Sequence, residues 1–259
     1  MLNIKDLKIN VWEKEILKWL SLDFEKWKNY LILGKNWSWK SSLVNFLMWN
    51  PKYEFKSWKI ELNWNNFLDL WVNERSLAWI FLSFQHIPEI PWIKLSEYLR
   101  IIYNNSKKAE NQELMKKNKN IFYNNNTKFR GLSPFLFKRF IKKYLEELSI
   151  SEEFLDRELN VGFSGWEKRK IEILQARLLE PKFIFFDEID SGLDLDAFKQ
   201  VVSLISKIDN KENSIIMITH NFNVIDYLNF DKVYVLKNWI LDKSSWIDIL
   251  DEIKKKWFN

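Results

Sequence analysis

Cysteine is absent from this chain of 259 residues, and glycine is scarce, with only five residues. Without cysteine the chain can form no disulfide and offers no thiolate ligand to a metal. It also lacks an apolar run long enough to cross a membrane. Charged residues stand at the N-terminus, where a signal peptide needs its apolar stretch. We therefore expect a cytoplasmic protein with no direct membrane insertion.

The length suits one α/β domain, or a core with a modest subdomain. The net charge of +5 is only mildly basic, and lysine and asparagine are spread along the whole chain. A solvated surface explains this balance, so we expect no nucleic-acid partner.

Short apolar strands alternate with helical patterns, which predicts a parallel sheet with right-handed crossovers. The expected strands include residues 29–33, 80–84, 183–186, 214–219 and 232–236, and the expected helices include 41–48, 167–179 and 197–208. Residues 88–162 read mainly as an inserted helical subdomain, and residues 1–87 with 163–259 as the α/β core. The Asn/Lys-rich part of the insertion, 104–130, gives no clear structure.

A strand followed by a loop and a helix at residues 34–41 resembles a phosphate-binding loop. The pattern needs glycines whose backbone N–H groups cradle phosphates, a lysine for the outer phosphates and a hydroxyl for Mg²⁺. The candidate nucleotide-binding residues here are Gly34, Lys35, Asn36, Trp37, Ser38, Trp39, Lys40, Ser41 and Ser42. Because Trp39 stands where the pattern requires glycine, a plain polar turn remains an alternative for this segment alone.

Polar residues follow three other expected strands: Gln85, the pair Asp187 and Glu188, and His220. At such a strand end an aspartate can hold Mg²⁺ and an adjacent glutamate can polarise an attacking water. A further candidate anion site, around Ser164, begins the helix that follows. Acidic residues after a strand, a lone histidine and a serine helix cap are each common without function.

The order of these signals resembles the ABC ATPase family across nearly the whole chain. Residues 85–91, 161–168, 172–175 and 187–197 are further similar to SufC-type members, the ATPases of Suf iron–sulfur cluster assembly. The resemblance implies a P-loop α/β fold of ABC type, with an antiparallel β edge and an inserted helical subdomain. It also implies ATP and Mg²⁺ as cofactors.

The resemblance implies a role for each site residue. Lys40 would neutralise the β/γ-phosphates, Glu188 would act as general base and His220 would sense the γ-phosphate. Ser41, Gln85 and Asp187 would surround Mg²⁺. The signature residues of one copy would complete the ATP site of another, with Asp194 near the dimer seam; these are Ser164, Gly165, Trp166 and Glu167.

The implied partners are SufB-like and SufD-like scaffold proteins, together with ATP-dependent self-dimerisation. The alternative from another class is the ATPase subunit of an ABC membrane transporter. The third reading is a degenerate, nucleotide-free module.

The fifteen tryptophans stand mostly where the family has glycine. Trp37, Trp39 and Trp166 fall on glycines of the phosphate loop and the signature, and an indole there would occupy the space of the phosphates. Others fall at turns: Trp12, Trp19, Trp27, Trp49, Trp58, Trp64, Trp79, Trp92, Trp239 and Trp246. Trp71 and Trp257 are not assigned. We hypothesise that the gene comes from a lineage that reads the codon UGA as glycine, and that the printed sequence was translated with a code that reads UGA as tryptophan. Position 12 would then be glycine, and Val11 would be the residue that contacts adenine.

Overall fold

The computed structural model describes most of the chain in two compact units, residues 1–86 with 181–259 and residues 87–180. The described backbone comprises residues 1–11, 14–34, 40–47, 53–56, 59–63, 65–70, 74–75, 80–83, 85–117, 130–209, 212–237 and 240–246. Each unit is described by itself. None of the described helices is both long enough and apolar enough to span a bilayer.

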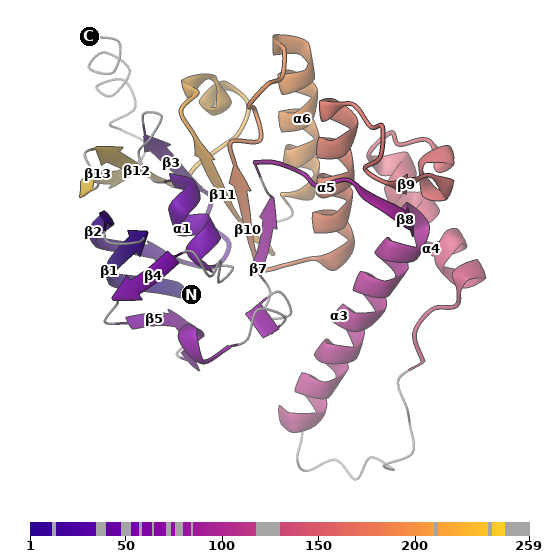
Figure 1. The fold of residues 1–259 in the computed structure, drawn as a ribbon, viewed down its shortest axis with the longest axis horizontal. Coiled ribbons are helices and arrows are strands. Elements are labelled where there is room, and N and C mark those ends of the chain that lie inside the picture. Colours follow the sequence, from indigo (N-terminus) through magenta and orange to yellow (C-terminus); the bar gives the residue numbers. More distant parts are fainter. Residues whose placement is uncertain are drawn as a thin grey trace. The chain divides into compact units, whose positions relative to one another are not determined.

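A six-stranded sheet forms the centre of the first unit (Figure 1), in the order β13-β12-β3-β11-β10-β7. The strands are β3 (Tyr30–Gly34), β7 (Ile80–Ser83), β10 (Phe183–Asp187), β11 (Ser214–Thr219), β12 (Lys232–Lys237) and β13 (Ile240–Trp246). All neighbours pair in parallel except β13, which is antiparallel to β12. Every residue of β3, β10 and β11 is buried, as expected for parallel strands covered on both faces.

An antiparallel sheet forms the other layer of this unit. It contains β1 (Leu2–Val11), β2 (Lys14–Phe24), β4 (Tyr53–Lys56), β5 (Lys59–Leu62) and β6 (Asn65–Asn66). Tyr30 and Tyr234 of the large sheet stack with ring centroids 6.0 Å apart, and Phe24 of β2 meets both edge-on. Aromatic packing therefore joins the two sheets, and the predicted parallel α/β sheet with an antiparallel β edge is confirmed.

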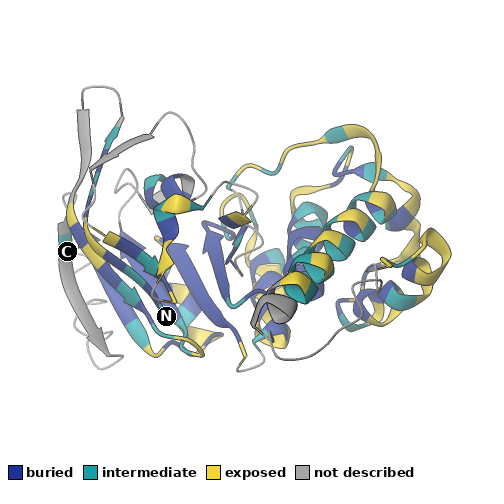
Figure 2. Cartoon of the chain, turned by 90° about the horizontal axis from the view of Figure 1, so that it is seen from below, coloured by how far each residue is buried: buried dark blue, intermediate teal, exposed yellow. Residues whose placement is uncertain are grey.

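Two helices complete the described part of this unit. Helix α1 (Lys40–Leu47) contacts β4 and β10, one strand from each sheet, and buries Leu43, Val44, Phe46 and Leu47. Helix α6 (Leu195–Ile208) buries one apolar face with a spacing of three to four residues. Figure 2 shows the central strands almost entirely buried, with exposed residues on the outer faces of the helices. Short 3₁₀ turns occur at Phe67–Asp69 and Phe222–Asp226.

The second unit is mainly helical. Helix α3 (Leu95–Lys117) packs against α4 (Pro134–Glu147) and α5 (Gly165–Leu179), and β8 (Ile90–Lys94) pairs with β9 (Glu158–Leu159). A 3₁₀ turn, Glu152–Asp156, precedes β9. The sequence analysis assigned residues 163–180 to the core, whereas in the structure they are grouped with this unit, because α5 packs on α3 and α4.

Candidate nucleotide-hydrolysis site

The carboxyl ends of four parallel strands meet at one edge of the large sheet. In register, Asp187 of β10 lies beside Ile218, and Thr219 of β11 lies beside Leu33. Gly34, the last residue of β3, pairs with Leu236. Ligands of open parallel sheets bind at this edge. The register therefore brings the residues after β3, β7, β10 and β11 to the same place.

Glu188 occupies the centre of this edge. Its backbone adopts the left-handed conformation, with φ 47°, and its N–H donates to the carbonyl of Ile218 at 2.8 Å. A non-glycine residue held in this region is strained, and such strain gathers at functional sites. The backbone N–H of Ser191 in turn donates to the Glu188 carbonyl at 2.9 Å, which closes a tight turn after the strand.

The Glu188 side chain, only 12% exposed, lies between two of the other predicted residues. Gln85 donates from Nε2 to Glu188 Oε2 at 3.0 Å, and His220 Nδ1 lies 3.5 Å from Oε1. Glu188 therefore contacts a predicted residue from each of two other strand ends, those of β7 and β11. The structure therefore brings together Gln85, Glu188 and His220, as the sequence predicted for the ends of these strands.

Sequence reasoning missed a pair that fixes this arrangement. The Thr219 hydroxyl lies 3.0 and 2.9 Å from the two carboxylate oxygens of Asp190, and it accepts a bond from Asn221 N at 2.9 Å. The pair joins the turn that carries Glu188 to the turn that carries His220. Asp190 lies in the segment 187–197 noted above, and Thr219 directly precedes His220. This closeness to site residues was the signal that the sequence offered.

The phosphate-loop prediction is only partly within the described structure. Gly34 is buried at the end of β3, and Lys40 and Ser41 begin α1, so the order strand, loop, helix is as expected. The side chains of Lys40 and Ser41 are not described, and Ser42 is half-buried. Five predicted residues lie outside the described part of the chain: Lys35, Asn36, Trp37, Ser38 and Trp39.

The donor chemistry at this edge fits Mg²⁺. Asp187 is 3% exposed at the end of β10, and Gln85, which carries an amide oxygen, follows β7 at the same edge of the sheet. Mg²⁺ is usually held by one or two carboxylates together with waters and substrate phosphates. Asp187 and Gln85, with the Ser41 hydroxyl, are therefore the residues that would hold it.

The signature residues lie in the second unit, at the start of α5. Ser164 is the N-cap: its hydroxyl accepts from Glu167 N at 3.2 Å, and Ser164 N donates to the Glu167 carboxylate at 2.7 Å. A Cβ on Gly165 would meet no atom of the described residues within 4 Å, so those residues leave space for a side chain at this position. The Lys170 ammonium lies 4.9 Å from the centre of the Trp166 ring. The result is an exposed helix start that is capped by its own Ser164 and Glu167.

Asp194 is the N-cap of α6 and accepts from Ala197 N at 2.8 Å. Its carboxylate is exposed. In the single chain Asp194 therefore stabilises a helix start and does not contact Gln85, Glu188 or His220 through any interaction described.

The chain is similar to known ATPases along its whole length. It is 35% identical over 262 residues to the probable ATP-dependent transporter ycf16 of Cyanophora paradoxa, covering 100% of this chain and 95% of that protein. It is 33% identical over 261 residues to the iron–sulfur cluster assembly protein SufC of Plasmodium falciparum, covering 100% of this chain and 70% of that protein. No protein-family model matches.

Solved structures agree on the fold. The dimeric ATP-binding cassette MJ0796 in a post-hydrolysis state, bound to ADP and Pi, superimposes with a TM-score of 0.74 at 17% identity, covering 95% of this chain and 99% of that chain. A nucleotide-free ATP-binding cassette from an ABC transporter gives a TM-score of 0.72 at 20% identity, covering 100% of this chain and 95% of that chain. The site geometry, the fold and the full-length relatives lead to one conclusion: the chain belongs to the family of ABC ATPases that includes SufC and ycf16, and is an ATP-hydrolysing enzyme.

Proposed function

We propose that this ATPase drives iron–sulfur cluster assembly on a SufB-like and SufD-like scaffold in the cytoplasm. The observation that carries the proposal is similarity over the full length of the chain to a relative named for that process, SufC of Plasmodium falciparum. The absence of cysteine is consistent with a subunit that moves the scaffold and does not hold the cluster.

The proposed chemistry follows from the Glu188 carboxylate. Glu188 accepts a proton from water as the water oxygen bonds to the γ-phosphorus and the bond to the β-phosphate oxygen breaks, giving ADP and phosphate. His220 orients the γ-phosphate, and Lys40 neutralises the β/γ-phosphates. Bound Mg²⁺ would supply charge neutralisation at the phosphates, held by Asp187 and its neighbours.

We further propose that two copies share each ATP. Ser164 and Gly165 present a hydroxyl and backbone N–H groups at a helix N-terminus, with Trp166 and Glu167 completing the turn. These groups would bind the γ-phosphate held by the other copy, and Asp194 would lie near the seam between copies. The structural relative MJ0796 is a dimer in its post-hydrolysis state, which supports this arrangement.

A second candidate function has its own support, because several relatives are named ATP-dependent transporters. In that case the partner is a membrane permease. Affinity purification of the tagged chain from its native cells separates the two. Recovery of two soluble SufB-like and SufD-like proteins supports cluster assembly, whereas recovery of an integral membrane protein in their place supports the transporter.

The tryptophan content bears directly on nucleotide binding, and we propose that the native protein carries glycine at most of these positions. Trp19, Trp27 and Trp92 adopt left-handed backbone conformations, with φ of 54°, 66° and 72°. Glycine enters this region freely, and a bulky residue there is an outlier. The three side chains are 58%, 65% and 90% exposed, so burial gives no reason for tryptophan.

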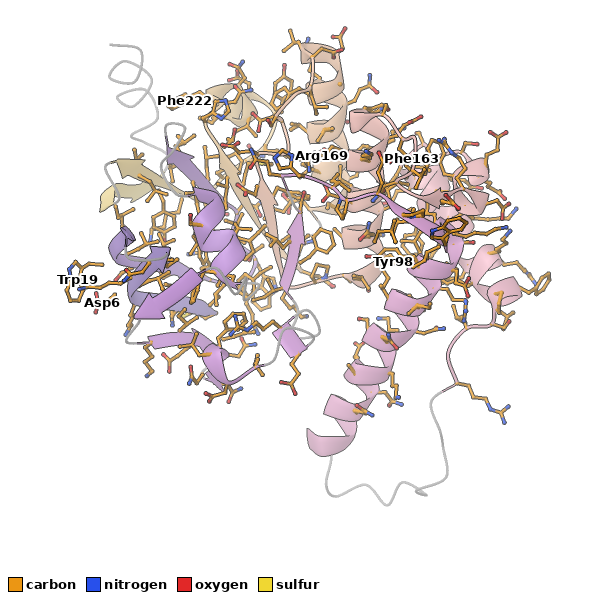
Figure 3. The ribbon with its side chains drawn as sticks, in the orientation of Figure 1. Asp6, Trp19, Tyr98, Phe163, Arg169 and Phe222 are labelled. Atoms are coloured by element: carbon orange, nitrogen blue, oxygen red, sulfur yellow. The ribbon has the colours of Figure 1, made fainter. Side chains whose placement is uncertain are left out.

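The local backbone at Trp19 supports the same proposal. The β1–β2 ladder shifts register between Leu7 and Ile9, whose partners are Leu20 and Leu17, so Trp19 stands in a β-bulge. Figure 3 shows its side chain at the outer edge of that sheet. Bulges of this kind favour glycine in the left-handed conformation. A single residue type, glycine, is replaced by a single other type, tryptophan. This pattern supports UGA recoding and not the loss of function through accumulated mutations, which would replace many residue types.

Two measurements test this proposal. In-frame UGA at codons 37, 39 and 166 and an intact native mass below that of the printed sequence are expected. A native mass that matches fifteen tryptophans would overturn recoding and favour the nucleotide-free module. An ATP-binding assay on the chain with tryptophan and with glycine at 37, 39 and 166 should detect strong binding only for glycine.

A further inference from the structure

Arg75 is a buried cation of the first unit. It is 1% exposed, and its guanidinium carbon lies 4.7 Å from the centre of the Phe67 ring, which is buried as well. Burial lowers the pKa of Arg75 to about 10, so the side chain is still charged at neutral pH. Because a buried charge is costly, the benefit of this arginine must come from the bonds that it makes.

Two of these bonds close the last turn of α1. Arg75 Nη1 donates to the carbonyls of Phe46 and Leu47, at 3.4 and 3.0 Å. Helix α1 ends at Leu47 and has no basic residue of its own in the last turn. The last carbonyls of a helix have no partner within the helix and form the negative end of its dipole. Arg75 therefore supplies the charge and the N–H donors that the sequence of α1 lacks at this end.

The same guanidinium ties this helix end to the antiparallel sheet. Arg75 Nε donates to the Leu70 carbonyl at 3.0 Å. Leu70 is the C-cap of the 3₁₀ turn Phe67–Asp69, and that turn contacts β5. A planar guanidinium carries its donors in a fixed geometry, so one side chain can hold two segments in a set relation, whereas a lysine offers a single rotating nitrogen.

We propose that Arg75 is a positioning residue for phosphate binding. The start of α1 carries Lys40 and Ser41, and the helix is only eight residues long, about 12 Å. Its buried face packs through apolar contacts, which have no direction, so the bonds of Arg75 fix how far the helix can slide or turn. By holding the last turn of α1, Arg75 keeps Lys40 where the phosphates bind. The inference rests on the proposed role of Lys40 at the β/γ-phosphates.

The first test is Arg75→Met in the ATP-binding version of the chain, which has glycine at positions 37, 39 and 166. Methionine fills the space with an apolar chain, and such a replacement of a buried charge is often neutral for stability or stabilising. Stability in urea should therefore be kept, while the Kd and the KM for MgATP should rise about tenfold, because the charge-assisted contact of Lys40 is weakened. The kcat at saturating ATP should change less than twofold. A purely structural role would leave both the Kd and the KM unchanged in this stable variant.

The second test is Arg75→Ala with methylguanidinium as the probe. Alanine leaves space that the added cation can fill, and the cation brings back the lost N–H donors. The Kd for MgATP should rise about tenfold and return most of the way in millimolar methylguanidinium. Arg75→Met is the matched control, because its side chain occupies the space, so the same cation should not restore its affinity.

Lys40→Ala in the same version separates the two proposals. If Lys40→Ala binds MgATP as tightly as the unsubstituted chain, the proposed role of Lys40 is overturned, and the inference with it. If Lys40→Ala loses affinity while Arg75→Met keeps it, the positioning role alone is overturned. Failure of methylguanidinium to restore the affinity of Arg75→Ala would also overturn the positioning role.

Discussion

Replacing Trp92 should stabilise the chain when the new residue is glycine and not when it is alanine. Trp92 has φ 72° and a side chain 90% exposed, so removal of the indole costs almost no buried area. Alanine keeps the Cβ that makes the left-handed conformation unfavourable, whereas glycine removes it. The difference between the two variants therefore isolates the backbone strain.

The magnitude follows from two opposing terms. Relief of the left-handed conformation of an L-residue should raise the free energy of unfolding by about 1–2 kcal/mol. The greater conformational freedom of glycine in the unfolded chain lowers it by about 0.4–1 kcal/mol. About 0.5–1 kcal/mol of stabilisation remains for Trp92, and a similar amount for Trp27, at φ 66°. Trp19 should gain less, because the Lys8 ammonium lies 3.5 Å from its ring centre. Such an exposed cation–π contact is worth about 0.5–1 kcal/mol.

Trp166 supplies a control of opposite sign. It stands in the first turn of α5 and is not among the residues with positive φ. Glycine inside a helix is about 1 kcal/mol less favourable than alanine. The order of the two variants at Trp166 should therefore be reversed, with alanine the more stable.

Urea unfolding followed by circular dichroism measures these differences, and the slope of each transition checks that the unfolded state is unchanged. The reasoning would be refuted if glycine and alanine gave equal stability at Trp92 and Trp27. It would also be refuted if glycine were the better residue at Trp166, because the effect would then not depend on the backbone conformation.

Three further predictions concern the site and the core. Glu188→Gln in the ATP-binding version should still bind ATP but lose turnover in a phosphate-release assay; retained turnover would remove Glu188 from the base role. Thr219→Val should lower kcat about tenfold with little change in ATP affinity, because the bond to Asp190 that positions His220 is lost; an unchanged kcat would contradict this. Burial raises the pKa of Tyr30 and of Tyr234 above 10.0, so the unfolded state releases these two protons at a lower pH than the folded state does. Their contribution to the free energy of unfolding is therefore fully present below pH 10.0 and is lost as the pH rises further. Tyr234→Phe should reduce that fall in an alkaline unfolding titration, and an identical pH profile would exclude this cause.

Local pattern and motif order determined the family of this protein. Apolar runs such as residues 183–186 predict buried parallel strands, and chemistry-bearing residues after such strands predict a ligand edge. The position of Glu188, directly after an apolar strand and Asp187, was enough to make it the candidate base. These features are local in sequence, because each depends on a strand, its end and the residue that follows.

Only the tertiary structure determined which side chains meet. Gln85 and Glu188 are 103 residues apart in sequence, and no periodicity predicts that an amide of one reaches the carboxylate of the other. The Thr219–Asp190 pair and the bond from Arg75 to Leu47 likewise depend on the alignment of segments distant in the chain. The sequence by itself showed tryptophan at positions where the family has glycine. The tertiary structure gave a physical reason at Trp19, Trp27 and Trp92, because each has a positive φ, which a Cβ makes unfavourable.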